Sequence, residues 1–313
     1  MADLFVSTLI QGLIYALVSF GVYITYSILD FPDLGVDGTF PLGAAVTALL
    51  LIKGVDPWLT LVISLLVGAL AGLFTGVVHV RLKVRDLLAG IITMTALFSV
   101  NLLIAGGANL PVERAVDTIF TASSTMAILG GLTLSGRKLV ISLVLAVAVK
   151  LVLDLYFKTK SGLLLRAVGD NAALVTSLAR DKGSVKILGL MISNALVALG
   201  GCLVCHETRS FSATMGTGQL VFGLAAVIIG VSLFRFYGAT GLAQALRRCR
   251  PLRFLGSPRD TTAVIVGGFL YKACIQIAMS LGLPTNMLKL VTAVLFLLVL
   301  VVSGRKGEEI IHA

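Results

Sequence analysis

Nine apolar runs, most of them about as long as a membrane-crossing helix, follow one another along the 313 residues of the chain. Because a bilayer core takes roughly 20 apolar residues per helical crossing, runs that recur over the whole length predict a polytopic membrane protein. The expected spans are residues 4–28, 40–52, 58–80, 87–105, 138–157, 185–205, 218–236, 261–281 and 286–303. We therefore expect an all-α transmembrane helical bundle of about nine or ten spans.

The composition indicates that residues 1–313 form a single transmembrane domain. Hydrophobic residues make up 58% of the chain and charged residues 13%, whereas soluble domains carry roughly 25% charged residues. The longest polar stretches, 158–186 and 235–260, are shorter than an independently folded domain. The net charge is +10, but most basic residues lie in the segments between the spans and not on a folded soluble face. This argues against nucleic-acid binding.

One stretch between the first two spans interrupts the apolar pattern. Residues 30–38 read DFPDLGVDG and combine helix breakers with the carboxylates of Asp30, Asp33 and Asp37. The span that follows is also short for a crossing, so we expect a discontinuous second helix. The three carboxylates either recognise an amino group at the pore or are solvated at a helix end.

The distribution of Lys and Arg predicts the orientation of the bundle. Most of the 25 basic residues fall in segments 81–85, 158–186, 235–259 and 305–306, which are therefore expected to be cytoplasmic. The C-terminus is then inside, and nine crossings place the N-terminus outside unless the interruption turns back within the membrane. A further apolar piece at 119–134 is expected to form a short re-entrant or outer-surface helix.

The loop between the fifth and sixth spans is the most informative segment. Gly169 is expected to break the preceding run, and Asp170 or Asn171 can accept hydrogen bonds from the free N–H groups of a following turn. Residues 172–178 therefore read as a short capped helix. This amphipathic helix either docks in a groove of a soluble partner, with Arg166 facing a carboxylate there, or lies on the bilayer surface.

This loop resembles the cytoplasmic coupling loop of ABC permeases of the branched-chain amino-acid and ribose type. Residues 162–171 follow the pattern Gly-x3-Arg-Ala-x-Gly-Asp-Asn, and residues 20–44 are similar to the start of that family's second helix. The stretches 85–102 (RDLLAGIITMTALFSVNL) and 282–293 (GLPTNMLKLVTA) resemble a narrower branch, the permeases encoded beside tryptophan- or tyrosine-type binding proteins. The likeness covers residues 10–303.

The resemblance implies a membrane-spanning permease subunit of an ATP-driven importer for a small solute, an amino acid that is aromatic in the narrower branch. It implies a homodimer of this chain or a pseudo-symmetric pair of permeases, and two cytoplasmic ATPase subunits that bind ATP and Mg. It also implies an extracytoplasmic substrate-binding protein and a place in a bacterial cytoplasmic membrane. The chain has no phosphate-binding GxxxxGK[ST] motif, so we expect no cofactor and no catalysis on it. The implied ATPase-coupling residues, within a cytoplasmic loop at 158–184, are Gly162, Arg166, Ala167, Gly169, Asp170, Asn171 and Leu174.

Polar side chains at membrane depth form a second set of candidates, because they are costly to place there. The candidates for a translocation pathway are Asp33, Asp37, Thr93, Thr95, Ser99 and Asn101. Thr95 and Ser99 are four residues apart and share a helix face; such residues either line a polar path or hydrogen-bond between helices. The alternative function is a stand-alone secondary transporter in which discontinuous helices and intramembrane charge provide ion coupling.

Two lysines lie well inside expected spans, away from the span ends. Lys150 and Asp154 are four residues apart and are expected to pair on one face. Lys272 lies next to Tyr271 well inside its span, so its ammonium group is not expected to reach water by snorkelling. It is expected to face either the dimer interface or the pathway.

Two further patterns concern helix packing. Gly68, Gly72 and Gly76 form a small-x3-small ladder that predicts a close helix contact. Residues 202–206 read CLVCH, which matches a c-type haem attachment motif. The motif ends an apolar span with no haem-enclosing sequence beside it, so a disulfide or buried packing thiols are the favoured interpretations.

Overall fold

The computed structural model describes residues 2–170, 181–239, 260–280, 282 and 287–311, and helices account for nearly all of its regular structure. The helices are α1 (Ala2–Val22), the π-helix η1 (Tyr23–Ile28), α2 (Val36–Ile52), α3 (Pro57–Val80), α4 (Asp86–Ala105), α5 (Ser123–Leu129), α6 (Leu134–Tyr156), α7 (Lys160–Asp170), α9 (Lys182–Thr208), α10 (Gln219–Ala239), α13 (Asp260–Ser280) and α14 (Leu288–Ile311). Two short strands, β1 (Asn109–Pro111) and β2 (Ser210–Ser212), pair antiparallel.

The polytopic all-α bundle is confirmed. Within the described residues, six helices are long and apolar enough to cross a membrane. They are Leu4–Ile28, Pro57–Val80, Asp86–Ala105, Leu134–Tyr156, Lys182–Thr208 and Asp260–Ser280. Three shorter apolar helices accompany them, at Val36–Ile52, Gln219–Phe234 and Leu290–Val301. Each of the nine expected spans therefore corresponds to a helix.

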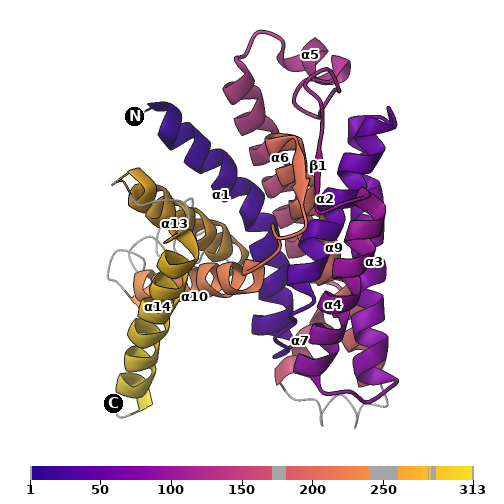
Figure 1. Ribbon diagram of the computed structural model, residues 1–313. Helices are drawn as coiled ribbons and strands as arrows, with labels where there is room; N and C mark the ends of the chain where they lie inside the picture. The colour runs from indigo at the N-terminus through magenta and orange to yellow at the C-terminus, as the bar shows by residue number, and fades with distance from the viewer. Residues whose placement is uncertain (1, 171–180, 240–259, 281, 283–286, 312–313) are drawn as a thin grey trace.

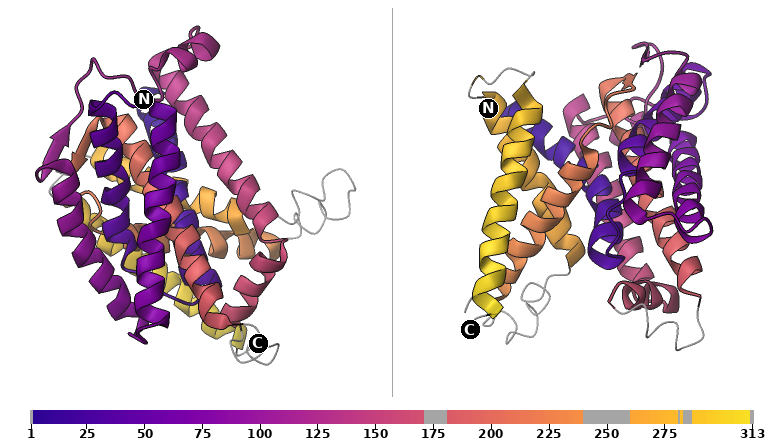
Figure 2. Two further views of the ribbon diagram at one scale, coloured as in Figure 1. Left: turned by 90° about the vertical axis from the view of Figure 1, so that its right-hand side faces the viewer. Right: turned by 60° about the horizontal axis from the view of Figure 1, so that its bottom comes forward.

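Helix α1 lies between two groups of helices (Figure 1). On one side it contacts α6 and α9, and α9 in turn packs against α2 and α3. On the other side it contacts α10 and α13, and α14 packs against both of these helices. The right-hand view in Figure 2 shows the same division.

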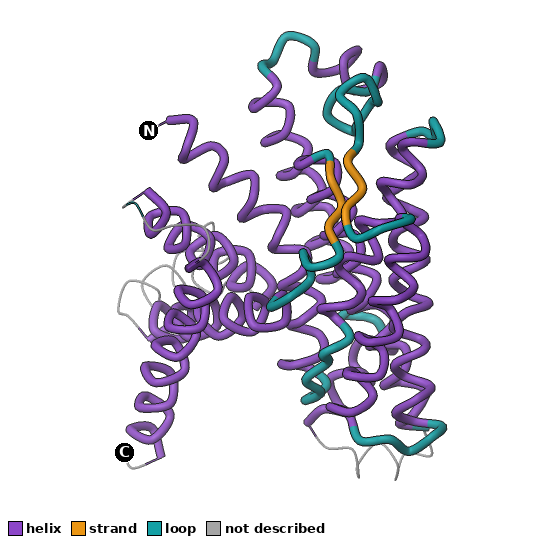
Figure 3. The backbone as a smooth tube through the Cα atoms, in the orientation of Figure 1, coloured by secondary structure: helices purple, strands orange, loops and turns teal. Residues whose placement is uncertain are grey.

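The two ends of the bundle differ in what they carry. The start of α1 and helix α5 lie at one end, whereas α7 and the end of α14 lie at the other (Figure 1). The expected short helix at 119–134 is α5, at the end opposite α7. The β1–β2 pair lies in the half of the bundle that carries α5 (Figure 3), with Leu110 opposite Phe211.

The expected interruption lies between η1 and α2. Residues 29–35 are not helical, and Asp30 there adopts the left-handed conformation with φ of 52°. Helix α2 begins at Val36, four residues earlier than the sequence indicated, and continues through Pro41. The discontinuity is therefore a buried non-helical segment before α2, and α2 itself is continuous. We call residues 29–35 the break segment.

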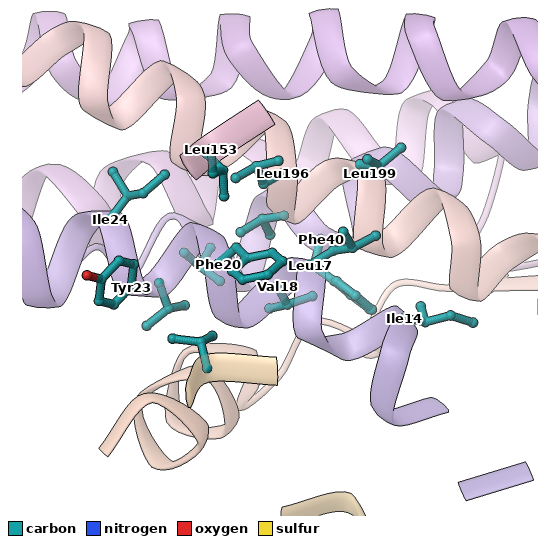
Figure 4. Packing of buried hydrophobic residues seen from close by; sticks show 14 of the residues in the cluster. Ile14, Leu17, Val18, Phe20, Tyr23, Ile24, Phe40, Leu153, Leu196 and Leu199 are labelled. Atoms are coloured by element: carbon teal, nitrogen blue, oxygen red, sulfur yellow. The ribbon is translucent and has the colours of Figure 1, made fainter. Parts of the chain in front are cut away.

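Buried apolar side chains pack around α1 and the break segment. Figure 4 shows that side chains of α1 and η1 meet those of α2, α6 and α9. The labelled residues of this cluster are Ile14, Leu17, Val18, Phe20, Tyr23, Ile24, Phe40, Leu153, Leu196 and Leu199. The C-terminal half of α1 is thus packed on several sides by other helices.

The glycine ladder of α3 packs directly against α9, as predicted. A Cβ atom at Gly72 would overlap the carbonyl oxygen of Leu190, and one at Gly76 would lie 3.0 Å from the Cα of Ile187. The opposite face of α3 is apolar and exposed, with Leu70 at 61%. Close backbone contact is a major source of helix association in lipid, where apolar burial gives little.

Replacing Gly72 by Ala should destabilise the protein although Ala is the better helix former. The added methyl group would force α3 away from α9, and overpacking of this kind costs about 1–3 kcal/mol. Gly268→Ala in α13 is the matched control, because its Cβ would meet Ser19 Oγ at 3.5 Å, an ordinary contact. Thermal unfolding in detergent measures both variants, and equal melting temperatures would contradict the close α3–α9 contact.

Candidate functional site

Helix α7 contains most of the expected coupling motif and shows two unlike faces. Leu165 and Val168 are buried, at 0% and 3% exposure, whereas Leu163 is 57% exposed and Arg166 is also exposed. The expectation that Gly169 breaks the helix is wrong, because α7 continues through it to Asp170. Helix α7 is therefore an amphipathic element with one face on the bundle and one face free.

Gly169 is required for close contact with the π-helix. A Cβ atom there would overlap the carbonyl oxygen of Ile28, the last residue of η1. Gly162, in the first turn of α7, likewise lies against the carbonyl oxygen of Tyr156. A glycine inside a helix costs about 1 kcal/mol relative to Ala, and the approach of two backbones explains why that cost is tolerated here.

The buried face of α7 reaches the break segment. A Cβ atom at Gly189 of α9 would lie 2.6 Å from Leu29 Cδ1 and 2.7 Å from Leu165 Cδ1, so these two leucines meet over that glycine. Ala167 packs against the same core cluster. Any displacement of α7 must therefore displace the end of η1 and the start of the break segment, or open a cavity beside them.

Arg166 connects α7 to a second set of contacts. Its guanidinium carbon lies 5.0 Å from the centroid of the Phe157 ring. That ring meets the ring of Tyr23 edge-on at 6.4 Å, and the Tyr23 hydroxyl donates a hydrogen bond to Asp260 at 3.2 Å. These contacts link α7 to η1 and to the start of α13.

The rest of the coupling motif falls mostly outside the described residues. This applies to Asn171, Leu174 and the side chain of Asp170. The chain resumes at Asp181, whose carboxylate caps α9 by accepting hydrogen bonds from the N–H groups of Gly183 and Ser184. Hydrogen bonds from Ser184 and Gly183 hold the pKa of the exposed Asp181 carboxyl below its ordinary value.

Asp33 lies fully buried in the break segment, and both of its oxygens accept hydrogen bonds. The N–H of Gly35 donates to Oδ1 at 2.8 Å, and the side-chain amide of Asn194 donates to Oδ2 at 2.8 Å. The Thr39 hydroxyl in turn donates a hydrogen bond to the side-chain oxygen Oδ1 of Asn194, at 2.7 Å. This network ties the break segment to α2 and α9.

Asp37 binds the start of α10. Its Oδ2 accepts a hydrogen bond from the N–H of Gly218 at 2.9 Å and its Oδ1 accepts one from Leu220 at 2.8 Å. The first N–H groups of a helix lack partners within the helix and favour a negative charge. Asp37 thus caps α10 from the first turn of α2 and joins the two groups of helices.

The four candidates on α4 separate onto opposite faces. Thr93 is buried and accepts a hydrogen bond from Thr75 at 2.9 Å. Asn101 is 1% exposed and donates to the carbonyl oxygen of Gly38 at 3.0 Å; its own oxygen has no hydrogen-bond partner within the described residues. Thr95 and Ser99 are exposed and point away from the bundle.

Sequence reasoning missed the residues that partner these candidates. Asn194 was the detectable one, because it is a polar amide in the middle of the long apolar span 185–205. Thr39 and Thr75 gave no signal, since a threonine commonly bonds to the backbone of its own helix, as both do here at Gly35 and Ala71.

The CLVCH segment packs inside the bundle. Cys202 and Cys205 are buried free thiols, and His206 Nε2 lies 2.9 Å from Thr60 Oγ1. The disulfide interpretation is therefore wrong. The predicted pair of Lys150 and Asp154 is confirmed at 3.0 Å.

A cavity of about 480 Å³ opens at the end opposite α7. It is lined by the turn between α2 and α3 and by the segment that leads into α5. Asp56 and Asp117 are among the lining residues.

Helix α7 carries Gly162, Arg166, Ala167 and Gly169 of the motif on which the sequence resemblance rests. The family model for the permease component of the branched-chain amino acid transport system matches residues 4–300. The chain belongs to this permease family. As a transport permease it is not itself an enzyme.

Curated relatives of this permease agree with that assignment. It is 38% identical to a tyrosine transport system permease protein of Clostridioides difficile over 93% of its own length and 88% of that protein. It is 27% identical to a probable branched-chain amino acid transport permease protein of Methanocaldococcus jannaschii over 71% of each chain. It is also 27% identical to a ribose import permease protein of Haemophilus influenzae, over 63% of its length and 59% of that protein. No solved structure matches the permease.

Asp37→Asn should destabilise this permease, because the amide removes the charge and turns a donor toward the N–H groups of α10. Hydrogen bonds to charged groups are worth about 1.5–3 kcal/mol, so we expect a loss of about 2 kcal/mol. Asp30→Asn is the matched control, since Asp30 lies nearby in the break segment but is exposed. Asn also tolerates its left-handed conformation. Unfolding in detergent gives both values. A normal unfolding free energy for D37N would contradict the capping role.

Proposed function

We propose that this permease is the membrane-spanning subunit of an ATP-driven importer for an amino acid, with an aromatic amino acid as the substrate. The contact of α7 with the end of η1 supports the transport mechanism, because it joins a solvent-facing helix to the break segment. The substrate class is supported by the 38% identity to a tyrosine transport system permease protein.

In this proposal two cytoplasmic ATPase subunits bind ATP and Mg, and each grips one coupling loop. The exposed face of α7, which includes Leu163 and Arg166, docks in a groove of the ATPase. Nucleotide-driven movement of that groove displaces α7. Because α7 packs on Ile28 and Leu29, the displacement reaches the break segment and α2 and alternates the opening of the pathway.

The proposed assembly contains two copies of this chain in a bacterial cytoplasmic membrane. The α7 end and the C-terminus face the cytoplasm, in keeping with the basic segments between spans. The substrate-binding protein docks at the α5 end, where the cavity beside Asp56 opens. The pathway passes the polar residues of the break segment.

Leu163→Asp should abolish association with the ATPase while the permease still folds, because this side chain is 57% exposed. Burying an unpaired carboxylate in an apolar groove costs several kcal/mol, so we expect at least a hundredfold weaker binding, about 3 kcal/mol. Leu82→Asp is the matched control, as Leu82 is 67% exposed in another loop. Co-purification of the two subunits measures the binding.

The same preparation separates the importer from a stand-alone secondary transporter. The importer requires that uptake into proteoliposomes depends on ATP, the ATPase and the binding protein together, and that L163D abolishes it. Uptake by the purified chain alone, driven by an ion gradient and unaffected by L163D, would refute the importer and support the ion-coupled alternative.

A further inference from the structure

Lys272 is a cation inside a membrane span, and no carboxylate of the described residues forms an ion pair with it. It lies in α13, twelve residues from the first residue of the helix and eight from the last. Lys150, another lysine well inside a span, pairs with Asp154. Lys272 is only half-buried, so part of its side chain faces outside the protomer. A charge in that place is costly unless water or an anion reaches it.

Aromatic rings surround the ammonium group. The Nζ atom lies 3.5 Å from the ring centroid of Tyr15 and 5.5 Å from that of Phe222. The rings of Tyr15 and Phe222 meet edge-on at 5.0 Å, and Phe222 meets Tyr271 in the same way at 5.0 Å. We call Lys272, Tyr15 and Phe222 the Lys272 cluster. Cation–π contacts offset part of the cost of the charge but leave it uncompensated.

The cluster lies beside both helix starts that Asp37 joins. Phe222 is two residues beyond Leu220, whose N–H donates to Asp37. Phe40, in the next turn of α2 after Asp37, has its ring 5.9 Å from that of Tyr15. In transporters, the starts of interrupted or short helices within the membrane are where substrates bind.

A nearby acidic group does not remove the need for an anion. Glu207 at the end of α9 lies within electrostatic range of both Lys138 and Lys272, but within the described residues neither lysine forms an ion pair with it. The Lys138 ammonium group also donates to the Glu207 backbone carbonyl, at 3.4 Å. Within the described residues, the ammonium group of Lys272 therefore contacts aromatic faces and no carboxylate.

We propose that the Lys272 cluster binds the carboxylate of the transported solute, an inference that rests on the proposed import function. The ammonium group of Lys272 pairs with the carboxylate. The partly exposed ring of Tyr15, which holds the lysine in place and packs on the buried Phe222, offers an apolar contact for an aromatic side chain. The ligand class is therefore an aromatic carboxylate, which an aromatic amino acid satisfies.

The main test is uptake of L-tyrosine by proteoliposomes that contain the permease, its ATPase and its binding protein. Lys272→Met should lower uptake at saturating tyrosine at least tenfold, because the carboxylate loses its partner. Lys272→Arg keeps the positive charge over the Tyr15 ring and should retain at least a third of wild-type uptake. Lys138→Met is the matched control, since Lys138 also lies over an aromatic ring, that of Phe120 at 5.9 Å, and its uptake should be unchanged.

A purely structural lysine gives a different result. If Lys272 only holds α13 against α1, Lys272→Met lowers the melting temperature in detergent and leaves the uptake of the folded complex at the wild-type rate. That result would overturn the proposal. Equal losses of uptake in the Lys272→Met and Lys138→Met variants would overturn it too. The loss would then follow from removing any positive charge from the bundle and would not be specific to Lys272.

A labelling experiment tests the site without relying on tyrosine. Lys272→Cys is made with Cys249 and Cys274 replaced by Ser, while Cys202 and Cys205 stay in place because they are buried. Sulfonatoethyl methanethiosulfonate, an anionic reagent that does not cross lipid, should label this cysteine in the reconstituted transporter. An unlabelled cysteine would show that anions do not reach the position and would overturn the proposal. If the wild-type permease shows no ATP-dependent uptake of tyrosine, the proposed function is refuted. The labelling result still shows, independently of tyrosine, whether anions reach position 272.

Discussion

The break segment sets the main constraint on this bundle, because most of its backbone N–H groups lie among apolar helices without helical hydrogen bonds. A peptide group left unpaired in such surroundings costs several kcal/mol. The N–H of Phe31 reaches back to the carbonyl of Thr25, and the N–H of Gly35 is taken by Asp33. Asp33 must itself be satisfied, and Asn194 of α9 does so. A single interruption therefore requires a π-helix before it and a polar residue in a distant span.

The break segment also connects α7 with α10. On one side Gly169 of α7 touches Ile28, directly before the break segment. On the other side Asp37, directly after it, holds the start of α10. A movement of α7 and a movement of α10 thus act on one short piece of chain. Packed interiors respond to such movements by switching between discrete arrangements, because they have little free volume.

The sequence predicted what depends on one helix at a time. Long apolar runs give the spans, and residues four apart on one helix give the Lys150–Asp154 pair. It did not predict which face of α4 meets the bundle, so Thr93 and Thr95 received the same interpretation although one is buried and the other exposed. The rotation of a helix against its neighbours depends on packing with segments far along the chain, which periodicity in one span does not contain.

Gly169 shows why helix α7 was the hardest part to predict. A glycine at a helix end and a glycine at a helix crossing look identical in sequence. Gly106 ends α4 in the left-handed conformation, with φ of 70° and open space where a Cβ would stand. Gly169 stays helical and has a carbonyl oxygen at that place. Helix propensity favours the first interpretation for both. Only the position of η1 distinguishes them, and η1 lies more than a hundred residues earlier in the chain.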